Sequence, residues 1–492
     1  MQKLLLVTVS AAALLAAAPV VAGDNTSAVN QTGTNASATV NQGGANSDST
    51  VNQGGNLNNA VVNQNGAQLG AKSTINQTGD GNHANVTQAD DGSDYLGAGG
   101  PIDVSNVAQG GNGNTANVTQ NTGTLQIQSN SDVNQGGSNN IANVTQVDDE
   151  QSSSVSQSSD GNTANVNQGD ASKVASDGSF GNGSSINQHG AGGHTATVTQ
   201  SSLLNNSSVD QDGAANSATV TQNGGSGDYG NGSAVVQSGD HNGAQVNQYG
   251  MTNNSNVGQS GSYDSASVAQ TGSDNGSSVG QSSYHDIAQV NQAGSANSSS
   301  VNQSSGDAGI GSPYPTSAAY AYVNQVGDDN LSTIDQSGAS NWAVLNQTNS
   351  NNESHIAQTG TGTFANVSQS GPDNYSRVSQ SGTNTNLNVA VGVRQSGSSN
   401  ESYVDQSGLG TVYNSWENTV DIDQSGDDNL SDVAQGGQDN ETRIDQSGSD
   451  NLSYVIQAGT TNHAYVDQSS GGNLSNINQS GSNSTATVTQ GM

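Results

Sequence analysis

The chain has 492 residues and is strongly acidic, with 40 Asp and Glu against 6 Lys and Arg and a formal net charge of −34. Hydrophobic residues make up 29% of it, aromatic residues 3%, and it has no cysteine. The acidity disfavours direct binding of nucleic acid, and the lack of cysteine excludes disulfides as a source of stability. So polar a composition alone would predict disorder, but the chain is too regular for that.

The first 22 residues predict a cleaved signal peptide. Lys3 gives a positive start, an apolar run extends from Leu4 to Leu15, and Ala22 precedes Gly23 at a small-residue cleavage site. This run is too short for a membrane anchor, and no later segment is apolar over the length that a bilayer requires. We therefore expect an exported mature chain without a transmembrane segment.

From residue 23 to residue 492 we expect one domain built from a short phrase that ends in Gln. There are 38 such glutamines between Gln31 and Gln490, and 28 of the 37 intervals between them are eleven residues long. Val or Ile stands two residues before the glutamine in 37 of the 38 phrases, and Asn stands six residues before it in 25. A fixed period of this kind predicts a repeat architecture.

The phrase from Asn82 to Gln88 predicts a β-strand. Asn82, Ala84, Val86 and Gln88 are spaced by two, so an extended backbone places all four on one face, whereas a helix would scatter them. After each glutamine come Gly, Asn, Asp and Ser, with Gly usually at the second place, as at Gly79. We interpret this stretch as a tight turn in which Gly or Asn takes a positive φ.

Two phrases, about 22 residues, would form one strand–turn–strand rung whose inner faces meet. Rungs stacked at about 4.8 Å would bring equal side chains into columns: Val and Ala would pack, and Asn and Gln would form amide ladders. We therefore predict an all-β fold, a β-solenoid of about nineteen rungs and roughly 90 Å. The residues that we expect in the columns are Asn82, Ala84, Val86, Gln88, Gln109, Asn114, Val118, Gln120, Gln157, Asn162, Gln168, Gln211, Asn216, Val220, Gln222, Gln424, Asn429, Gln435, Gln446, Asn451 and Gln457.

Four insertions interrupt the period, near residues 89–101, 171–181, 304–315 and 408–415. Because the phrase resumes after each one, we expect loops that leave the edge of a rung. Twelve of the thirteen tyrosines lie from Tyr229 onward, and several of them precede an inward Val, which places them on the outside. Such aromatic rows could be lateral contacts between fibrils, shelves for sugars, or cross-strand pairs that stiffen the sheet.

The sequence shows no catalytic constellation, and we predict no enzyme activity, no cofactor and no metal. His189 and His194 are close in sequence and could form at most a weak metal site, because no Cys or carboxylate cluster supports them. The acidic pairs Asp328-Asp329 and Asp427-Asp428 could bind Ca²⁺. The simpler interpretation is that turn acids keep the surface solvated and restrain lateral aggregation.

The pattern Gln-x-Gly-x-x-Asn-x-Ala-x-x-x-Gln, present from Gln77, Gln109 and Gln211, resembles the curlin repeat of bacterial curli subunits. A second form, Ser-x-x-x-x-x-Gln, occurs from Ser47 and from Ser129. The resemblance covers nearly all of the predicted mature chain, which has several times more repeats than typical members. It assigns ladder roles to the Asn and Gln residues of matching phrases.

This resemblance implies a structural subunit that leaves the cell through an outer-membrane channel and polymerises on the surface as a functional amyloid. It further implies self-association, other curlin-like subunits as partners, and roles in cell adhesion and biofilm matrix. The alternative is a monomeric secreted solenoid that acts as an adhesin or binds ice. That alternative would require a capped end and a flat, regular outer array such as Thr-x-Thr.

Overall fold

The computed structural model describes residues 24–43, 45–66, 70–90, 103–122, 129–147, 150–169, 181–224, 229–304, 318–382, 389–408 and 418–491. Within them the chain forms 38 β-strands, and all but a few end at the glutamine of a phrase or one to three residues after it. Among these residues no helix is long and apolar enough to cross a membrane.

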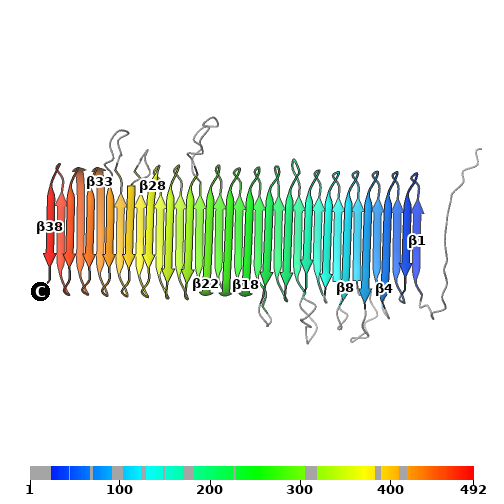
Figure 1. Cartoon of the computed structure of the whole chain (residues 1–492), viewed down its shortest axis with the longest axis horizontal. Helices are drawn as coiled ribbons and strands as arrows, with labels where there is room; N and C mark the ends of the chain where they lie inside the picture. Colours follow the sequence, from blue (N-terminus) through cyan, green and yellow to red (C-terminus); the bar gives the residue numbers. More distant parts are fainter. Residues whose placement is uncertain are drawn as a thin grey trace, which may run out of the picture.

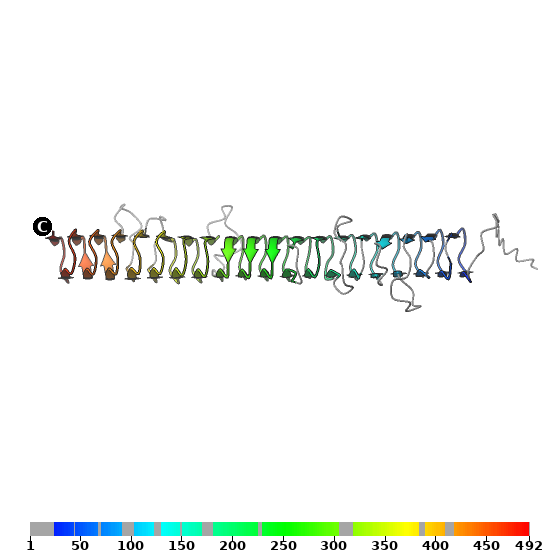
Figure 2. The ribbon, with the colours of Figure 1, turned by 90° about the horizontal axis from the view of Figure 1, so that it is seen from below.

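The strands alternate between two sheets that face each other across a thin core (Figures 1 and 2). Each odd-numbered strand pairs with the next odd-numbered strand, and each even-numbered strand with the next even-numbered one. Every pairing is parallel and usually advances by 22 residues, as when Val29 lies beside Val51 and Val246 beside Val268. One rung is therefore one odd strand, a turn and one even strand, and the predicted β-solenoid is confirmed.

The first sheet contains the odd strands: β1 Thr26–Gln31, β3 Asp48–Gln53, β5 Lys72–Gln77, β7 Asp103–Gln109, β9 Ser129–Gln135, β11 Ser152–Gln157, β13 Gly183–Gln188, β15 Asn206–Gln211, β17 Gly232–Gln237, β19 Asn254–Gln259, β21 Gly276–Gln281, β23 Ser298–Gln303, β25 Leu331–Gln336, β27 Glu353–Gln358, β29 Tyr375–Gln380, β31 Glu401–Gln406, β33 Leu430–Gln438, β35 Leu452–Thr460 and β37 Leu474–Gln479. The second sheet contains the even strands: β2 Ser37–Gln42, β4 Asn59–Gly66, β6 His83–Asp90, β8 Thr115–Thr122, β10 Ile141–Val147, β12 Thr163–Gln168, β14 Thr195–Ser201, β16 Ser217–Asn223, β18 Gly243–Met251, β20 Ser265–Ser273, β22 Ile287–Ser295, β24 Tyr320–Val326, β26 Trp342–Thr348, β28 Thr363–Gln369, β30 Val389–Gln395, β32 Thr419–Gln424, β34 Glu441–Gln446, β36 His463–Gln468 and β38 Thr485–Gln490.

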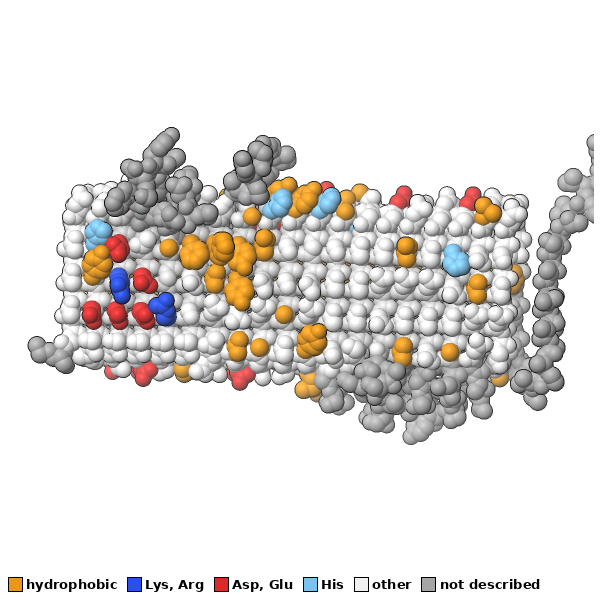
Figure 3. Space-filling model, in the orientation of Figure 1, with side chains coloured by type: hydrophobic (Ala, Val, Ile, Leu, Met, Phe, Trp, Pro, Cys, Tyr) orange, Lys and Arg blue, Asp and Glu red, His pale blue; other side chains and the backbone are white. Residues whose placement is uncertain are grey.

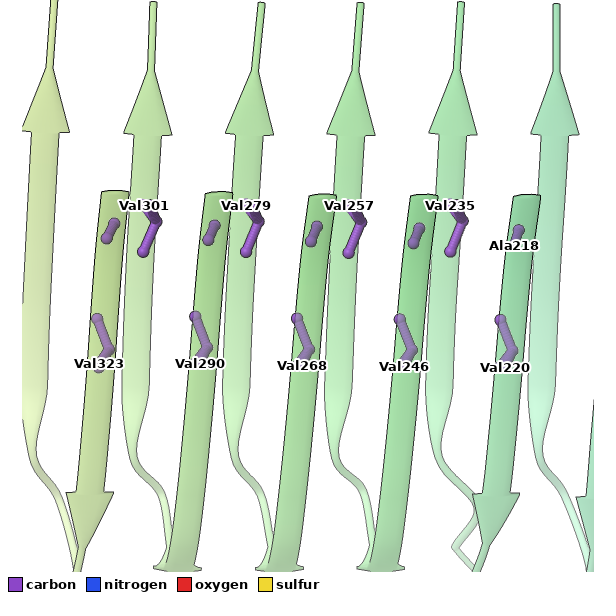
Figure 4. Packing of buried hydrophobic residues seen from close by; sticks show 14 of the residues in the cluster. Ala218, Val220, Val235, Val246, Val257, Val268, Val279, Val290, Val301 and Val323 are labelled. Carbon is purple, nitrogen blue, oxygen red and sulfur yellow. The ribbon is translucent and has the colours of Figure 1, made fainter. Parts of the chain in front are cut away.

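The core is a set of side-chain columns that run the length of the molecule. Because strand side chains alternate, the residues two and four before each glutamine point inward with it. Figure 4 shows Val235, Val257 and Val279 of the odd strands as one row, with the Val row of the even strands in the facing layer. These valines are at most 1% exposed. The core is thus one side chain deep from each sheet.

The turns differ in one respect from the sequence interpretation. Gly79, Gly111, Gly426 and Gly448 stand at the second turn place, and none of these four has a positive φ. An ideal Cβ on Gly79 would lie 2.0 Å from the main-chain oxygen of Gly111 in the next rung. These glycines are therefore required by the close stacking of turns.

Positive φ instead recurs at the fourth turn place, and there it is not restricted to glycine. Gly81, His241, Tyr263 and Asp428 all occupy it, with φ between 54° and 67°. Some second-place glycines, such as Gly250 at 115°, are also left-handed. The left-handed residue was thus predicted for the right turns, but its main place is two residues later.

The predicted insertions fall almost entirely outside the described residues, as does the predicted signal peptide. Residues 91–101, 171–180, 305–315 and 409–415 are not described. At one edge the structure corrects the prediction: Ala89 and Asp90 still belong to β6 and pair with Asn121 and Thr122 of β8. The strand continues there because its neighbour in the stack is equally long.

Candidate functional site

The Gln columns are continuous amide ladders. Gln211 Nε2 donates to Gln237 Oε1 at 2.8 Å and, across the core, to the main-chain oxygen of Thr195 at 3.1 Å. Its Oε1 accepts from Gln188 Nε2 at 2.9 Å. The same amide-to-amide bond, at 2.8–2.9 Å, is donated by Gln88, Gln109, Gln120, Gln157, Gln168, Gln222, Gln424, Gln435, Gln446 and Gln457.

The Asn columns work differently, because their main partner is the backbone. Asn82 Oδ1 accepts the main-chain N–H of Asn114 at 2.9 Å, and Asn82 Nδ2 donates to the carbonyl of Gly111 at 2.8 Å. In the odd sheet the amides also bond one another: Asn429 Nδ2 donates to Asn400 Oδ1 at 3.0 Å. Each Asn thus fixes the turn of a neighbouring rung, where the strand's own hydrogen bonds end.

The structure places every residue that the sequence analysis assigned to a column on the inner face. All 21 are at most 1% exposed. Residues of one type meet their own type in the next rung: Ala84 lies beside Ala116, and Val86 beside Val118. An amide buried so deeply would be costly without a partner, and the ladder supplies one at each step.

A column that the sequence analysis missed consists of serine. Four residues before each odd-strand glutamine stands a buried Ser, as at Ser255 and Ser277, whereas the even strands carry Ala there. Within the described residues most of these hydroxyls, including both named ones, have no hydrogen-bond partner. The signal was present in the sequence as a second period of 22 residues, hidden by the stronger period of eleven.

The ladders give the solenoid a direction. Gln amides donate toward the C-terminal end, as Gln457 does to Gln479 at 2.9 Å. Asn oxygens accept N–H groups from the rung on that same side, as Asn451 Oδ1 accepts from Asn473 at 3.0 Å. One end of the stack therefore ends in Gln donors and Asn acceptors, and the other end in the complementary groups.

The first and last rungs described differ from all others in exposure and charge. β1 is exposed throughout, Val29 to 44%, and β38 alternates between exposed and half-buried residues. In the segments described, no further strand pairs with the outer edges of β1 and β2 or of β37 and β38. Residues 25–47 and 468–491 contain no ionisable side chain, although the chain carries 40 acids. Both ends are thus open and uncharged.

Charged side chains gather on the outside near the C-terminal end (Figure 3). Asp423, Asp445 and Asp467 lie in register on three successive even strands, and Arg394 donates to Asp423 at 3.1 Å. Burial, together with the neighbouring charges of Asp423 and Asp467, raises the pKa of the Asp445 carboxyl. Stacking therefore does bring like charges together, on the sheet face.

The exposed aromatic side chains contact one another along the axis. Tyr320, Trp342 and Phe364 occupy successive even strands, with ring centroids 4.7 and 6.3 Å apart. At the turns, Tyr263 stacks on His241 at 4.8 Å and on His285 at 5.0 Å. These are cross-strand pairs of the kind that stabilise a sheet surface.

The histidine and acid pairs considered as metal sites are used by the fold. His194 is fully buried: its Nε2 contacts the His189 carbonyl at 2.8 Å, and its Nδ1 accepts the N–H of Asn216 at 3.2 Å. Asp427 Oδ1 accepts from the Ser398 main chain at 2.9 Å. Across the described part of the chain, no three His, Asp or Glu residues are grouped as metal ligands would be.

Comparison with known families identifies part of this architecture. The model of the curlin associated repeat matches residues 327–360, 417–443 and 437–469, so the chain carries curlin associated repeats in its C-terminal region. The phrases that first suggested the resemblance, from Gln77 to Gln222, lie outside these segments but form the same rungs. No curated protein matches the chain significantly.

Proposed function

We propose that this chain, which carries curlin associated repeats on a β-solenoid, is the structural subunit of an extracellular curli-like fibre. In this proposal subunits add end to end, and the last rung of one chain becomes the neighbour of the first rung of the next. The observation that carries it is the pair of open, uncharged and complementary end rungs. Export by the predicted signal peptide and an outer-membrane channel, and service in adhesion and biofilm matrix, follow from the same resemblance.

The register of such a contact continues the 22-residue step. β37 would pair with β1 and β38 with β2, which places Ile477 beside Val29 and Val488 beside Val40. β2 reads Ser-Ala-Thr-Val-Asn-Gln and β38 reads Thr-Ala-Thr-Val-Thr-Gln, so four of six positions match. Gln479 and Gln490 would donate to Gln31 and Gln42, as each Gln does within the chain.

The polarity of the ladders favours head-to-tail addition over contact between two like ends. Two C-terminal ends would oppose Gln donors to Gln donors and leave buried amides unpaired. A heterologous contact that does not close on itself produces a filament. Unpaired strand edges provide the main-chain hydrogen bonds.

The charge distribution supports the same contact. The Debye length is about 10 Å at 0.1 M salt, roughly two rungs. Because about one rung at each end lacks ionisable groups, the closest carboxylates of two stacked subunits, Asp24 or Asp48 and Asp467, are kept apart by uncharged rungs. End-to-end contact thus avoids much of the repulsion that side-by-side contact of two acidic faces would meet.

The ice-binding alternative lacks its array. Outward threonines coincide on neighbouring strands only where Thr197 and Thr199 of β14 meet Thr219 and Thr221 of β16. On the next even strand the same places hold Gln245 and Asn247. Two rungs do not make a flat, regular surface.

The decisive experiment compares Val29→Lys with Ala28→Lys on the same exposed strand. Val29 points inward and would be covered by the next subunit, whereas Ala28 points outward. We expect Val29→Lys protein to add its intact C-terminal rung to wild-type seeds and then stop growth. A small fraction of it should therefore inhibit elongation, measured by amyloid-dye fluorescence and electron microscopy of seeded reactions.

Ala28→Lys is the matched control and should elongate nearly as wild type. Equal behaviour of the two variants would show that growth does not use this end. A wild-type protein that remains monomeric with and without seeds would instead favour the solitary secreted solenoid.

A further inference from the structure

The even-sheet Asn column is interrupted by two acids in successive rungs. Asp264 and Asp286 stand where Asn242 stands one rung earlier, and both are at most 1% exposed. Each keeps the acceptor role: Asp264 Oδ1 accepts the N–H of Asp286 at 2.9 Å, and Asp286 Oδ1 accepts that of Ala319 at 3.1 Å. Half of each carboxyl is therefore used as the amide oxygen of Asn would be.

The other oxygen of Asp264 occupies the place of an amide donor. In the preceding rungs, Asn216 Nδ2 donates to the Gly239 carbonyl at 2.6 Å and Asn242 Nδ2 to the Gly261 carbonyl at 2.9 Å. The equivalent carbonyl for Asp264 is that of Ser283. An ideal Cβ on Gly261 would lie 1.6 Å from Ser283 O and 2.5 Å from Asp264 Oδ2, so both oxygens border the same small space.

In the described structure Asp264 Oδ2 has no hydrogen-bond partner. Two buried acceptors side by side are compatible only if one of them carries a proton. A protonated Asp264 can donate to the turn of the next rung, as Asn would. An ionised Asp264 instead places a charge beside a carbonyl and beside Asp286, whose Oδ2 already accepts the Ser283 hydroxyl hydrogen bond.

The titratable groups around Asp264 come from three neighbouring turns. Its own turn contributes Tyr263; the rung before contributes Asp240 and His241; the rung after contributes Tyr284, His285 and Asp286. His241 and His285 stack on opposite faces of Tyr263 on the outside of the turn. Asp286 is the buried one among the charged residues of this set.

We propose that the proton held by Asp264 between two stacked turns acts as a pH-sensitive latch in the middle of the solenoid. With the proton in place the Asn column is continuous from rung to rung. Without it the stack is weakest between β20 and β22. The inference concerns a single chain and does not depend on fibre formation.

The direction of the pH effect follows from burial. Burial, with a smaller contribution from the charge of Asp286, raises the pKa of the Asp264 carboxyl to about 7, although the Asp286 and Gly261 amides act against the shift. An exposed Asp has a pKa near 3.9. The folded rungs thus hold a proton that the opened rungs release, so the added stability is complete below about pH 4 and is lost as the pH rises to about 7.

Hydrogen exchange of the monomeric chain, corrected for the intrinsic rate at each pH, tests this. We expect protection of amides within residues 265–295 to fall at least tenfold between pH 5 and pH 7, against little change within residues 429–452. In Asp264→Asn this fall should disappear, because the amide donates at every pH. Asp264→Asn should also raise the melting temperature more at pH 8 than at pH 4.5.

Two controls make the result specific. Asp274→Asn removes an acid from an exposed turn with the same left-handed backbone, and it should keep the wild-type profile. His241→Asn/His285→Asn removes the neighbouring imidazoles and should also keep it. Loss of the pH response in the histidine variant, or its persistence in Asp264→Asn, would overturn the proposal.

Discussion

The Gln columns and the Asn columns line the same narrow core, yet Gln occupies all 38 of its places and Asn only 25. A column Gln such as Gln248 donates to the next glutamine at 2.8 Å and to two main-chain carbonyls at 2.8 and 3.1 Å, while its oxygen accepts from the glutamine before it. No other side chain combines that reach with a donor and an acceptor on one group.

The Asn place needs chiefly one acceptor. Asn162 Oδ1, His194 Nδ1 and Asp264 Oδ1 each accept a main-chain N–H from the following rung, at 2.9, 3.2 and 2.9 Å. Ser129 Oγ does the same for Gln151 at 3.2 Å. The comparison teaches that a ladder tolerates substitution where one shared function can be supplied by several groups, and not where two functions must come from one.

The largest effect should therefore come from removing a column Gln. Gln211→Ala would leave Gln188 Nε2, Gln237 Oε1 and the Thr195 carbonyl each without one hydrogen bond. At about 1–3 kcal/mol for each stranded group, we expect a loss of several kcal/mol in unfolding free energy. Denaturant unfolding of the single chain measures it.

Thr219→Ala is the matched control, because Thr219 points outward from the neighbouring rungs and is half-buried. Its removal should change the unfolding free energy by less than about 0.5 kcal/mol. Equal losses in the two variants would mean that the inner and outer faces are energetically alike, and the contrast drawn here would fail.

Much of the fold could be predicted from sequence because the period of two decides which side chains point inward. Asn82, Ala84, Val86 and Gln88 needed no further information. The direction of each amide could not be predicted, since Asn429 donates toward one end and Gln435 toward the other. Nor could the role of His194 or Asp264, because a phrase that lacks its Asn looks like a lapse in the repeat until the backbone N–H beside it is seen.

The uncharged ends were visible in the sequence, but their meaning was not. Residues 25–47 and 468–491 become special only when the structure shows that they form the outermost rungs described. The acids at turns illustrate the same limit. Asp328 and Asp427 were interpreted as solvation or as calcium ligands, whereas each accepts a main-chain N–H of the preceding rung, from Ser295 and Ser398.

A smaller effect separates two exceptions in the Asn column by the sign of their pH dependence. Burial lowers the pKa of His194 below its usual 6.5, and only the neutral ring can accept the Asn216 N–H through Nδ1. The folded state therefore binds this proton less well than the unfolded state, and stability is lost as the pH falls below 6.5. Asp264 acts in the opposite direction.

We expect hydrogen-exchange protection around β14 and β16 to decrease from pH 7 to pH 5, and His194→Asn to remove most of that decrease. His83→Asn, which changes an outward histidine on β6, serves as the control and should leave the profile unchanged. A decrease that survives in His194→Asn would show that the imidazole is not the group responsible.

The smallest effect concerns the serine column, where the same reasoning predicts a change of sign. The Ser255 hydroxyl is buried without a hydrogen-bond partner in the described core, so Ser255→Ala removes a desolvated polar group and no bond. We expect it to be neutral or to stabilise the chain by up to about 1 kcal/mol. Ser402 is equally buried, but its hydroxyl donates to Ser376 Oγ at 3.1 Å, so Ser402→Ala should destabilise by about 0.5–1.5 kcal/mol. Thermal unfolding of the two variants compares them directly. If both destabilise alike, the serine column is bonded throughout, and the tolerance of this core would depend on polar pairing at every inward place rather than at the Gln and Asn columns.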